Sequence, residues 1–123
     1  MNEQLKHYHD FIDGLTKLNM TLYPKRVLEK GWPKIDENKD INDLLSRLSQ
    51  ADKEIISRII LHARVSGIHD TLVYLSDKEY KLVRDDIEIA NEPYGTTLYW
   101  DYIARKDESE WPTHQLNKKY ADK

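Results

Sequence analysis

Residues 50–75 constrain the fold more than any other feature, because their apolar side chains follow a helical period on two sides. At about 100° per residue these side chains fall into two stripes on opposite faces. One stripe contains Ile55, Ile56, Ile59, Ile60, Ala63 and Gly67, and the other contains Leu61, Val65, Ile68 and Leu72. A helix that is apolar on two sides is normally covered by neighbouring helices. We therefore predict a two-sided central helix in a small helical bundle. A break at Ser66-Gly67, giving two helices with separate faces, is the alternative.

Shorter helical patterns precede this segment. Apolar residues recur every three or four positions from Leu5 to Leu22, which predicts an amphipathic first helix that Pro24 ends or redirects. Residues 23–40 form a long connection. Asp40 is suited to cap a short helix, and Ser49-Gln50-Ala51-Asp52 resembles a capping box at the start of the central helix.

The pattern changes after Asp77. Residues 80–95 are predicted to contain a short extended or hairpin segment that includes the turn Asn91–Gly95. Residues 97–106 fit either a helix or a strand. Thr96 as a cap, and Asp101 and Arg105 at an i, i+4 spacing, favour the helix. The expected fold is mainly α, with one domain at 1–112 and a flexible tail at 113–123.

Composition excludes several classes of chemistry. The chain has 123 residues, of which 39% are hydrophobic and 33% charged, and it has no cysteine. Disulfides, zinc–thiolate sites, iron–sulfur clusters and cysteine nucleophiles are therefore excluded. No apolar run reaches the roughly 18 residues that cross a bilayer, and the first residues lack the apolar core of a secretion signal. These features predict a cytoplasmic protein without a membrane partner.

The charge pattern argues against a nucleic-acid partner. The net charge is −3, and Lys and Arg are scattered among Asp and Glu along the chain. Nucleic-acid-binding proteins usually carry a dense basic face. We therefore expect no nucleic acid, and an acidic surface suited to a basic partner.

Two histidines of the central helix are weak candidates for metal binding. His62 and His69 are separated by seven residues, so they face the same way but lie about 10.5 Å apart along the axis. One ion needs its ligand atoms much closer together. The sequence also lacks a phosphate-binding loop, a dinucleotide fingerprint and a serine-hydrolase elbow. We predict no catalytic residue, no metal and no cofactor.

Asp70 is unusual because an unbroken helix would place it within an apolar stripe. A buried carboxylate needs a hydrogen-bonding or charged partner, and Gly67 would allow a neighbouring group to approach closely. Three interpretations stay open. Asp70 caps a second helix, it pairs with an arginine such as Arg105, or it takes part in ligand binding.

Aromatic residues gather near Asp101 and Arg105, at Tyr94, Tyr99, Trp100, Tyr102 and Trp111. Such a concentration serves either core packing, which is the default, or a recognition surface. The acidic residues Asp85, Asp86 and Glu88 fit a solvated turn. The candidate polar or ligand site predicted from these patterns comprises His69, Asp70, Asp101, Arg105, Trp100 and Trp111.

Several motifs resemble those of a family of small uncharacterised bacterial proteins. They are Gly31-Trp32-Pro33, Gly67-Ile68-His69-Asp70, and Asp101-Tyr102-Ile103-Ala104-Arg105 followed by Trp111-Pro112. The resemblance spans about residues 25–112, although residues 107–110 lack the glycine expected before Trp-Pro. It implies a bacterial source and a cytosolic setting, and it implies no activity.

Three functions are compatible with these observations. The leading hypothesis is a non-enzymatic binding or protein-interaction domain, of the accessory or immunity type, with a protein partner. The alternative is a small-molecule or metal-dependent enzyme with a pocket between the central helix and residues 98–105. The third is a structural homodimer, so the predicted state is monomer or homodimer. Convergence of His69, Asp70, Asp101 and Arg105 on an open cleft would favour the enzyme.

Overall fold

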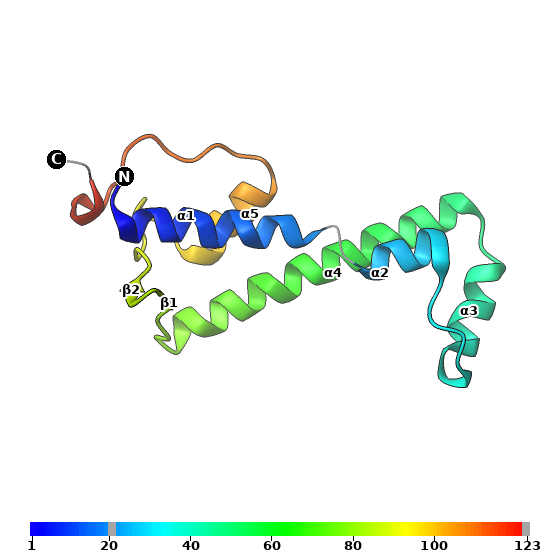
Figure 1. Cartoon of the computed structure of the whole chain (residues 1–123). Helices are drawn as coiled ribbons and strands as arrows, with labels where there is room; N and C mark the ends of the chain where they lie inside the picture. The colour runs from blue at the N-terminus through cyan, green and yellow to red at the C-terminus, as the bar shows by residue number, and fades with distance from the viewer. Residues whose placement is uncertain (20–21, 122–123) are drawn as a thin grey trace. The chain divides into compact units, whose positions relative to one another are not determined.

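The computed structural model describes residues 1–19 and 22–121, and their fold is mainly helical, as predicted. The chain divides into two compact units, which we call unit 1 (residues 1–18 and 67–123) and unit 2 (residues 19–66). Figure 1 shows the elements. The α-helices are α1 (Glu3–Thr16), α2 (Leu22–Lys25), α3 (Lys39–Ser46), α4 (Gln50–Asp77) and α5 (Leu98–Lys106). Short helical turns are η1 (Lys17–Asn19), η2 (Arg26–Lys30), η3 (Asp36–Asn38) and η4 (Lys118–Tyr120).

Helix α1 is amphipathic, as its pattern predicts, but it is shorter than the pattern. Asn2 caps it by accepting hydrogen bonds from the backbone N–H groups of Gln4 and Leu5. The helix ends at Thr16, and Pro24 lies inside α2 rather than at a helix end. Proline is tolerated there because the first turn of a helix needs no N–H donor. The side chain of Leu22, the last residue of the apolar pattern, lies outside the described structure.

The starts of α3 and α4 follow the predicted caps with one shift. Helix α3 begins at Lys39, one residue before the expected cap Asp40, whose carboxylate accepts from the N–H of Ile41 at 2.8 Å. Ser49 accepts from the N–H of Asp52 at 3.1 Å, as the capping box predicts.

Helix α4 runs through Ser66 and Gly67 without a break. Asp70 therefore lies inside a helix and does not cap one. A methyl group built on Gly67 would meet no described atom within 4 Å. The expectation that a neighbouring group approaches closely at Gly67 is therefore wrong. Burial along α4 is uneven, because Leu72 is 3% exposed whereas Ile55 and Ile59 are 46% and 59% exposed. The predicted apolar stripes are thus only partly covered.

The expected hairpin lies between α4 and α5 in unit 1. Strands β1 (Val83–Arg84) and β2 (Ile87–Glu88) are antiparallel, with Val83 opposite Glu88. Asp85 and Asp86 form the turn with φ angles of 53° and 62°. Two positive φ angles match the twist of a tight hairpin. The acidic residues at 85 and 86 are therefore the exposed turn that the sequence predicts.

Residues 98–106 form helix α5, and the strand alternative is wrong. The N-cap is Thr97, which accepts from the N–H of Trp100, and not the expected Thr96. Within unit 1, α5 packs against α1 (Figure 1). The largest fully buried side chains at this contact, Tyr8 and Tyr102, are 1% and 0% exposed. The α1–α5 contact is the core that positions the candidate site.

The C-terminal segment, for which the sequence predicts a flexible tail, makes defined contacts. The N–H of Asn117 donates to the carbonyl of Pro93 at 3.0 Å, and the hydroxyl of Tyr120 accepts from the N–H of Asn91 at 3.0 Å. Tyr120 is 3% exposed. In the described part of the chain, no helix is both long and apolar enough to cross a membrane.

Candidate functional site

Asp101 is the buried carboxylate of unit 1. Its side chain is on the face of α5 that meets α1, where one oxygen accepts from the Tyr8 hydroxyl and the other from the Thr96 hydroxyl. Burial raises the pKa of Asp101 above its ordinary value, and the hydrogen bonds from Thr96 and Tyr8 oppose that shift. Burial and the bond to Asp101 also raise the pKa of Tyr8. Both hydroxyls therefore act as donors to a fixed carboxylate.

A second carboxylate, Asp13 of α1, joins α1 to the end of α5 and to the segment after it. One oxygen of Asp13 accepts from Nε of Arg105 at 2.9 Å, and the other accepts from the indole N–H of Trp111 at 3.2 Å. Arg105 also donates to the carbonyl of Ser109 at 2.9 Å. The predicted i, i+4 pair between Asp101 and Arg105 is therefore wrong, because Arg105 reaches across to α1 instead.

Trp111 packs between polar groups of this network. The ring of His9 stacks on it with centroids 3.9 Å apart and an interplanar angle of 2°. The guanidinium of Arg105 lies 5.0 Å from the Trp111 ring centroid. His9 also hydrogen-bonds the hydroxyl of Tyr94. Burial lowers the pKa of His9, so the neutral imidazole is favoured.

The predicted site residues separate into two groups. Asp101, Arg105 and Trp111 belong to the α1–α5 network, whereas Trp100 is 65% exposed. His69 hydrogen-bonds the adjacent Asp70 at 3.2 Å, and the Asp70 side chain is 75% exposed. The interpretations of Asp70 as buried and as the partner of Arg105 are both wrong. The four residues that would favour an enzyme do not share one set of contacts.

Sequence reasoning missed three residues of the network, Tyr8, His9 and Asp13. All three lie on α1, and His9 and Asp13 are spaced i, i+4 beside the apolar stripe that contains Tyr8. That spacing was the available signal. It was not decisive, because polar residues beside an apolar stripe are ordinary on an amphipathic helix.

The metal hypothesis gains no support from the described residues. Among them, no group of three or more His, Asp or Glu side chains could hold an ion. His62 is exposed, and the ring of His69 contacts the edge of Tyr99 at a centroid distance of 5.5 Å. The two histidines therefore do not join a ligand set in the described structure.

Unit 1 contains a pocket of about 690 Å³, lined by the end of α4, the hairpin and the start of α5. This volume lies within the range of small-molecule sites. The buried Tyr8 of the network forms part of its wall, and the exposed Tyr80 and the half-buried Tyr99 supply further aromatic surface. The charged residues of the lining are Asp77, Glu79, Lys81, Glu88 and Glu92.

The pocket is acidic because only one of its carboxylates is paired. Lys81 lies 3.8 Å from Glu88, while Asp77, Glu79 and Glu92 form no ion pair within the described structure. Glu79 and Glu92 have φ angles of 59° and 46°. A left-handed backbone costs a residue other than glycine roughly 1 kcal/mol or more, and such strain often marks ligand sites. Both residues thus have a locally unfavourable backbone conformation.

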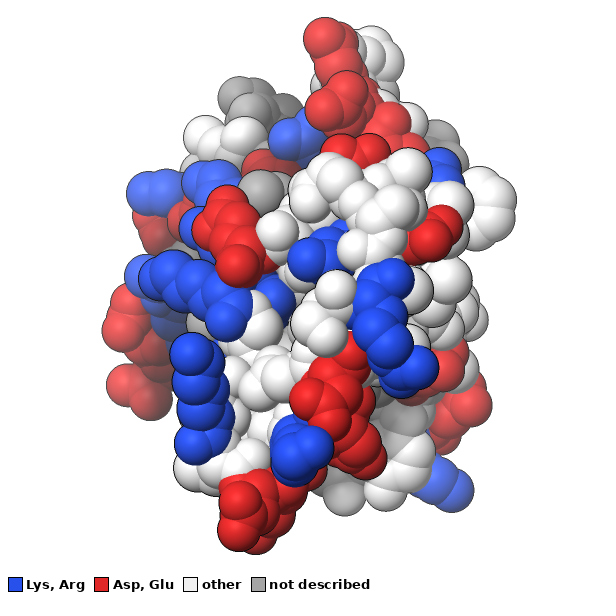
Figure 2. Space-filling model, turned by 90° about the vertical axis from the view of Figure 1, so that its right-hand side faces the viewer, with Lys and Arg blue, Asp and Glu red and all other residues white. Residues whose placement is uncertain are grey.

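The wider surface carries both signs of charge. On the face shown in Figure 2, Lys and Arg side chains alternate with Asp and Glu side chains around uncharged surface. The visible face therefore has no dense basic patch. The excess of negative charge described above is a property of the unit 1 pocket lining.

The chain belongs to a family of unknown function (DUF6547), whose family model matches residues 1–113. This membership agrees with the resemblance seen in the sequence motifs and brings no activity with it. No curated protein and no solved structure is detectably similar to the chain.

Proposed function

We propose that the protein is a non-enzymatic binding domain, and that the acidic pocket of unit 1 receives a Lys or Arg side chain of a protein partner. The observation that carries the proposal is the lining of this pocket, where Asp77, Glu79 and Glu92 are unpaired next to tyrosine rings. Carboxylates pair with ammonium or guanidinium groups, and aromatic faces add cation–π attraction of about 0.5–2 kcal/mol.

The polar network beneath the pocket supports a binding role rather than catalysis. Tyr8 lines the pocket, but its hydroxyl donates to the buried Asp101. The polar groups of Asp13, Arg105 and Trp111 are likewise hydrogen-bonded to one another. Groups committed to internal partners rigidify a site, and a rigid site binds with less loss of entropy. The hydrogen bond to Asp101 therefore fixes Tyr8, the member of the network that lines the pocket.

The test is a titration with a lysine- and arginine-containing hexapeptide, followed by backbone amide NMR. We expect shifts in amides of the pocket, such as Tyr80, Glu92 and Tyr99, and no comparable shifts with a glutamate hexapeptide. Replacing two lining carboxylates, Glu79→Gln with Glu92→Gln, is expected to weaken binding about tenfold or more, since each charged contact contributes roughly 1 kcal/mol.

The matched control is Asp85→Asn with Asp86→Asn, which removes the same charge from the hairpin turn outside the pocket lining. We expect its affinity to stay within about twofold of the wild type, because exposed charges a few residues away are screened by salt. Equal losses in the two double variants would show binding to general negative charge, and the proposed pocket would be abandoned.

A further inference from the structure

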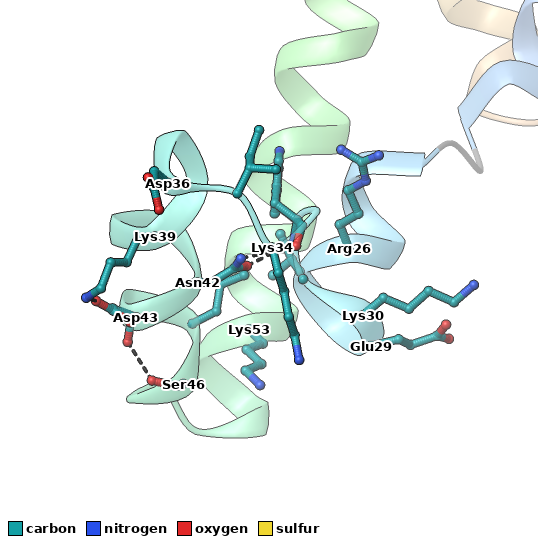
Figure 3. Close-up of a pocket in the computed structure, with 15 residues that line it drawn as sticks. Arg26, Glu29, Lys30, Lys34, Asp36, Lys39, Asn42, Asp43, Ser46 and Lys53 are labelled. Atoms are coloured by element: carbon teal, nitrogen blue, oxygen red, sulfur yellow. Dashed lines mark hydrogen bonds and ion pairs between the residues drawn. The ribbon is translucent and has the colours of Figure 1, made fainter.

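Unit 2 has its own pocket of about 460 Å³, formed by η2, the segment after it, α3 and the start of α4 (Figure 3). Its apolar part includes Val27 and Leu45, which are 3% and 8% exposed. Its polar part is rich in cations. The charged residues of the lining are Arg26, Glu29, Lys30, Lys34, Asp36, Lys39, Asp43 and Lys53.

One wall of this pocket is fixed by the Gly31-Trp32 motif. The π-helical turn η2 ends at Gly31, whose N–H donates to the carbonyl of Arg26 at 2.6 Å and whose φ angle is +70°. The side chain of Asn42 accepts from the N–H of Trp32 at 2.9 Å and donates to its carbonyl at 3.1 Å. Short π-helical turns are rare in proteins, and those that occur often lie at functional sites. The wall is therefore built by specific contacts between residues five and ten positions apart.

Two of the five cations already have partners. The guanidinium of Arg26 lies 5.6 Å and 5.8 Å from the ring centroids of Tyr23 and Trp32. Lys39 pairs with Asp43 at 2.9 Å. The others, Lys30, Lys34 and Lys53, form no ion pair in the structure as described.

Of the three free lysines, Lys30 extends away from the other two (Figure 3). In Figure 3, Lys34 and Lys53 extend in the same direction, whereas Asp36 lies away from their ammonium ends. Lys53 also occupies the first turn of α4, where the helix dipole disfavours a cation. An anionic ligand would offset the unfavourable interaction between the Lys53 ammonium group and the helix dipole. Lys53 is therefore suited to bind an anion in this pocket.

We infer that the pocket of unit 2 binds a small phosphate monoester with an apolar body. The phosphate is held by Lys34 and Lys53, and the apolar body packs on Val27, Leu45 and the Trp32 wall. Lysine ammonium groups act as point charges, and Lys34 and Lys53 supply no planar fork, so a doubly charged phosphate is favoured over a planar carboxylate. This inference is independent of the proposed function, which concerns a cationic group in unit 1.

The experiment uses phenyl phosphate as the probe and NMR of the full chain as the readout. Phenyl phosphate is expected to shift the indole N–H of Trp32 and the amide of Gly31, and to leave the indoles of Trp100 and Trp111 unchanged. Inorganic phosphate should bind about tenfold more weakly, because it buries no apolar surface. Absence of a shift at Trp32, or equal shifts with uncharged benzyl alcohol, would overturn the inference.

Variants of exposed or half-exposed lysines test the charge directly. Lys34→Gln with Lys53→Gln is expected to weaken phenyl phosphate binding by about tenfold or more. Lys6→Gln with Lys25→Gln removes the same charge outside the lining, and we expect a change below about twofold. Equal weakening by the two double variants would refute the assignment to this pocket. The titration with the cationic peptide tests the unit 1 pocket, and the titration with phenyl phosphate tests the unit 2 pocket. A negative result in one titration therefore leaves the other proposal unaffected.

Discussion

The carboxylate of Asp13 in α1 holds Arg105 and Trp111 at the same time, accepting from Nε of Arg105 at 2.9 Å and from the indole N–H of Trp111 at 3.2 Å. It joins the first helix of the chain to residues more than 90 positions later. The buried Asp101 makes a parallel connection through Tyr8. The α1–α5 contact therefore has two polar anchors as well as an apolar core.

Removal of the Asp13 anchor should destabilise unit 1. Because the Asp13 and Arg105 side chains are 33% and 27% exposed, solvent screens the pair, and we expect Asp13→Asn to cost about 1 kcal/mol. The measurement is the free energy of unfolding in urea. Asp10→Asn, an exposed change on the same helix, is the control and should stay within about 0.5 kcal/mol of the wild type. Equal effects would contradict the anchor.

Asp101 should make stability depend on pH in an unusual direction. Its folded-state pKa is raised, so above its ordinary value of 3.8 the folded chain binds this proton more tightly than the unfolded chain. Relative to Asp101→Asn, the wild type should lose stability as the pH rises from about 3.8 through the folded-state pKa. Urea unfolding of both proteins at several pH values measures the difference, and a difference independent of pH would disprove it.

Asp101→Ala removes the hydrogen bonds of the carboxyl group together with its charge. The alanine would leave the buried Tyr8 hydroxyl without its acceptor, at a cost of about 1–3 kcal/mol. The double variant with Tyr8→Phe removes both partners, so we expect a coupling energy of about 1 kcal/mol in a double-mutant cycle. Strictly additive losses would show that the bond contributes nothing measurable.

His9 should contribute the opposite pH dependence. Its pKa is lowered by burial, so the unfolded chain binds the proton more readily below the ordinary value of 6.5. Stability should therefore fall as the pH drops below 6.5, and His9→Gln should remove that part of the loss. NMR titration of the His9 ring gives the folded-state value directly. A midpoint at or above 6.5 would contradict the assignment.

Two glycines provide a matched test of backbone conformation. A methyl group on Gly31 would lie 2.8 Å from Oδ1 of Asn42, and its φ angle is +70°, so Gly31→Ala should destabilise by about 1–2 kcal/mol. Gly14 lies inside α1, where an added methyl group would meet no described atom within 4 Å outside the adjacent helix backbone. Gly14→Ala should therefore stabilise by about 0.5–1 kcal/mol. Thermal unfolding of both variants checks the opposite signs.

Local sequence patterns are sufficient to predict the helical class, the hairpin region and the capped start of α4. These features depend on local periods and on side chains that bond the backbone within a few residues, as Ser49 does with Asp52. The sequence also indicated membership of a family of uncharacterised proteins, and a family model of unknown function matches residues 1–113.

Which carboxylate is buried depends on packing between segments that are far apart in the chain. By period alone Asp70 lies in an apolar stripe, yet it is exposed, while Asp101 is buried against α1. A helical period places side chains on faces but does not say which face a neighbour covers. The α1 partners of Arg105 and Asp101 lie 92 and 93 residues away, so no local pattern could predict these two contacts. Packing of α5 against α1 buries Asp101, and the buried carboxylate is hydrogen-bonded to Tyr8 of α1.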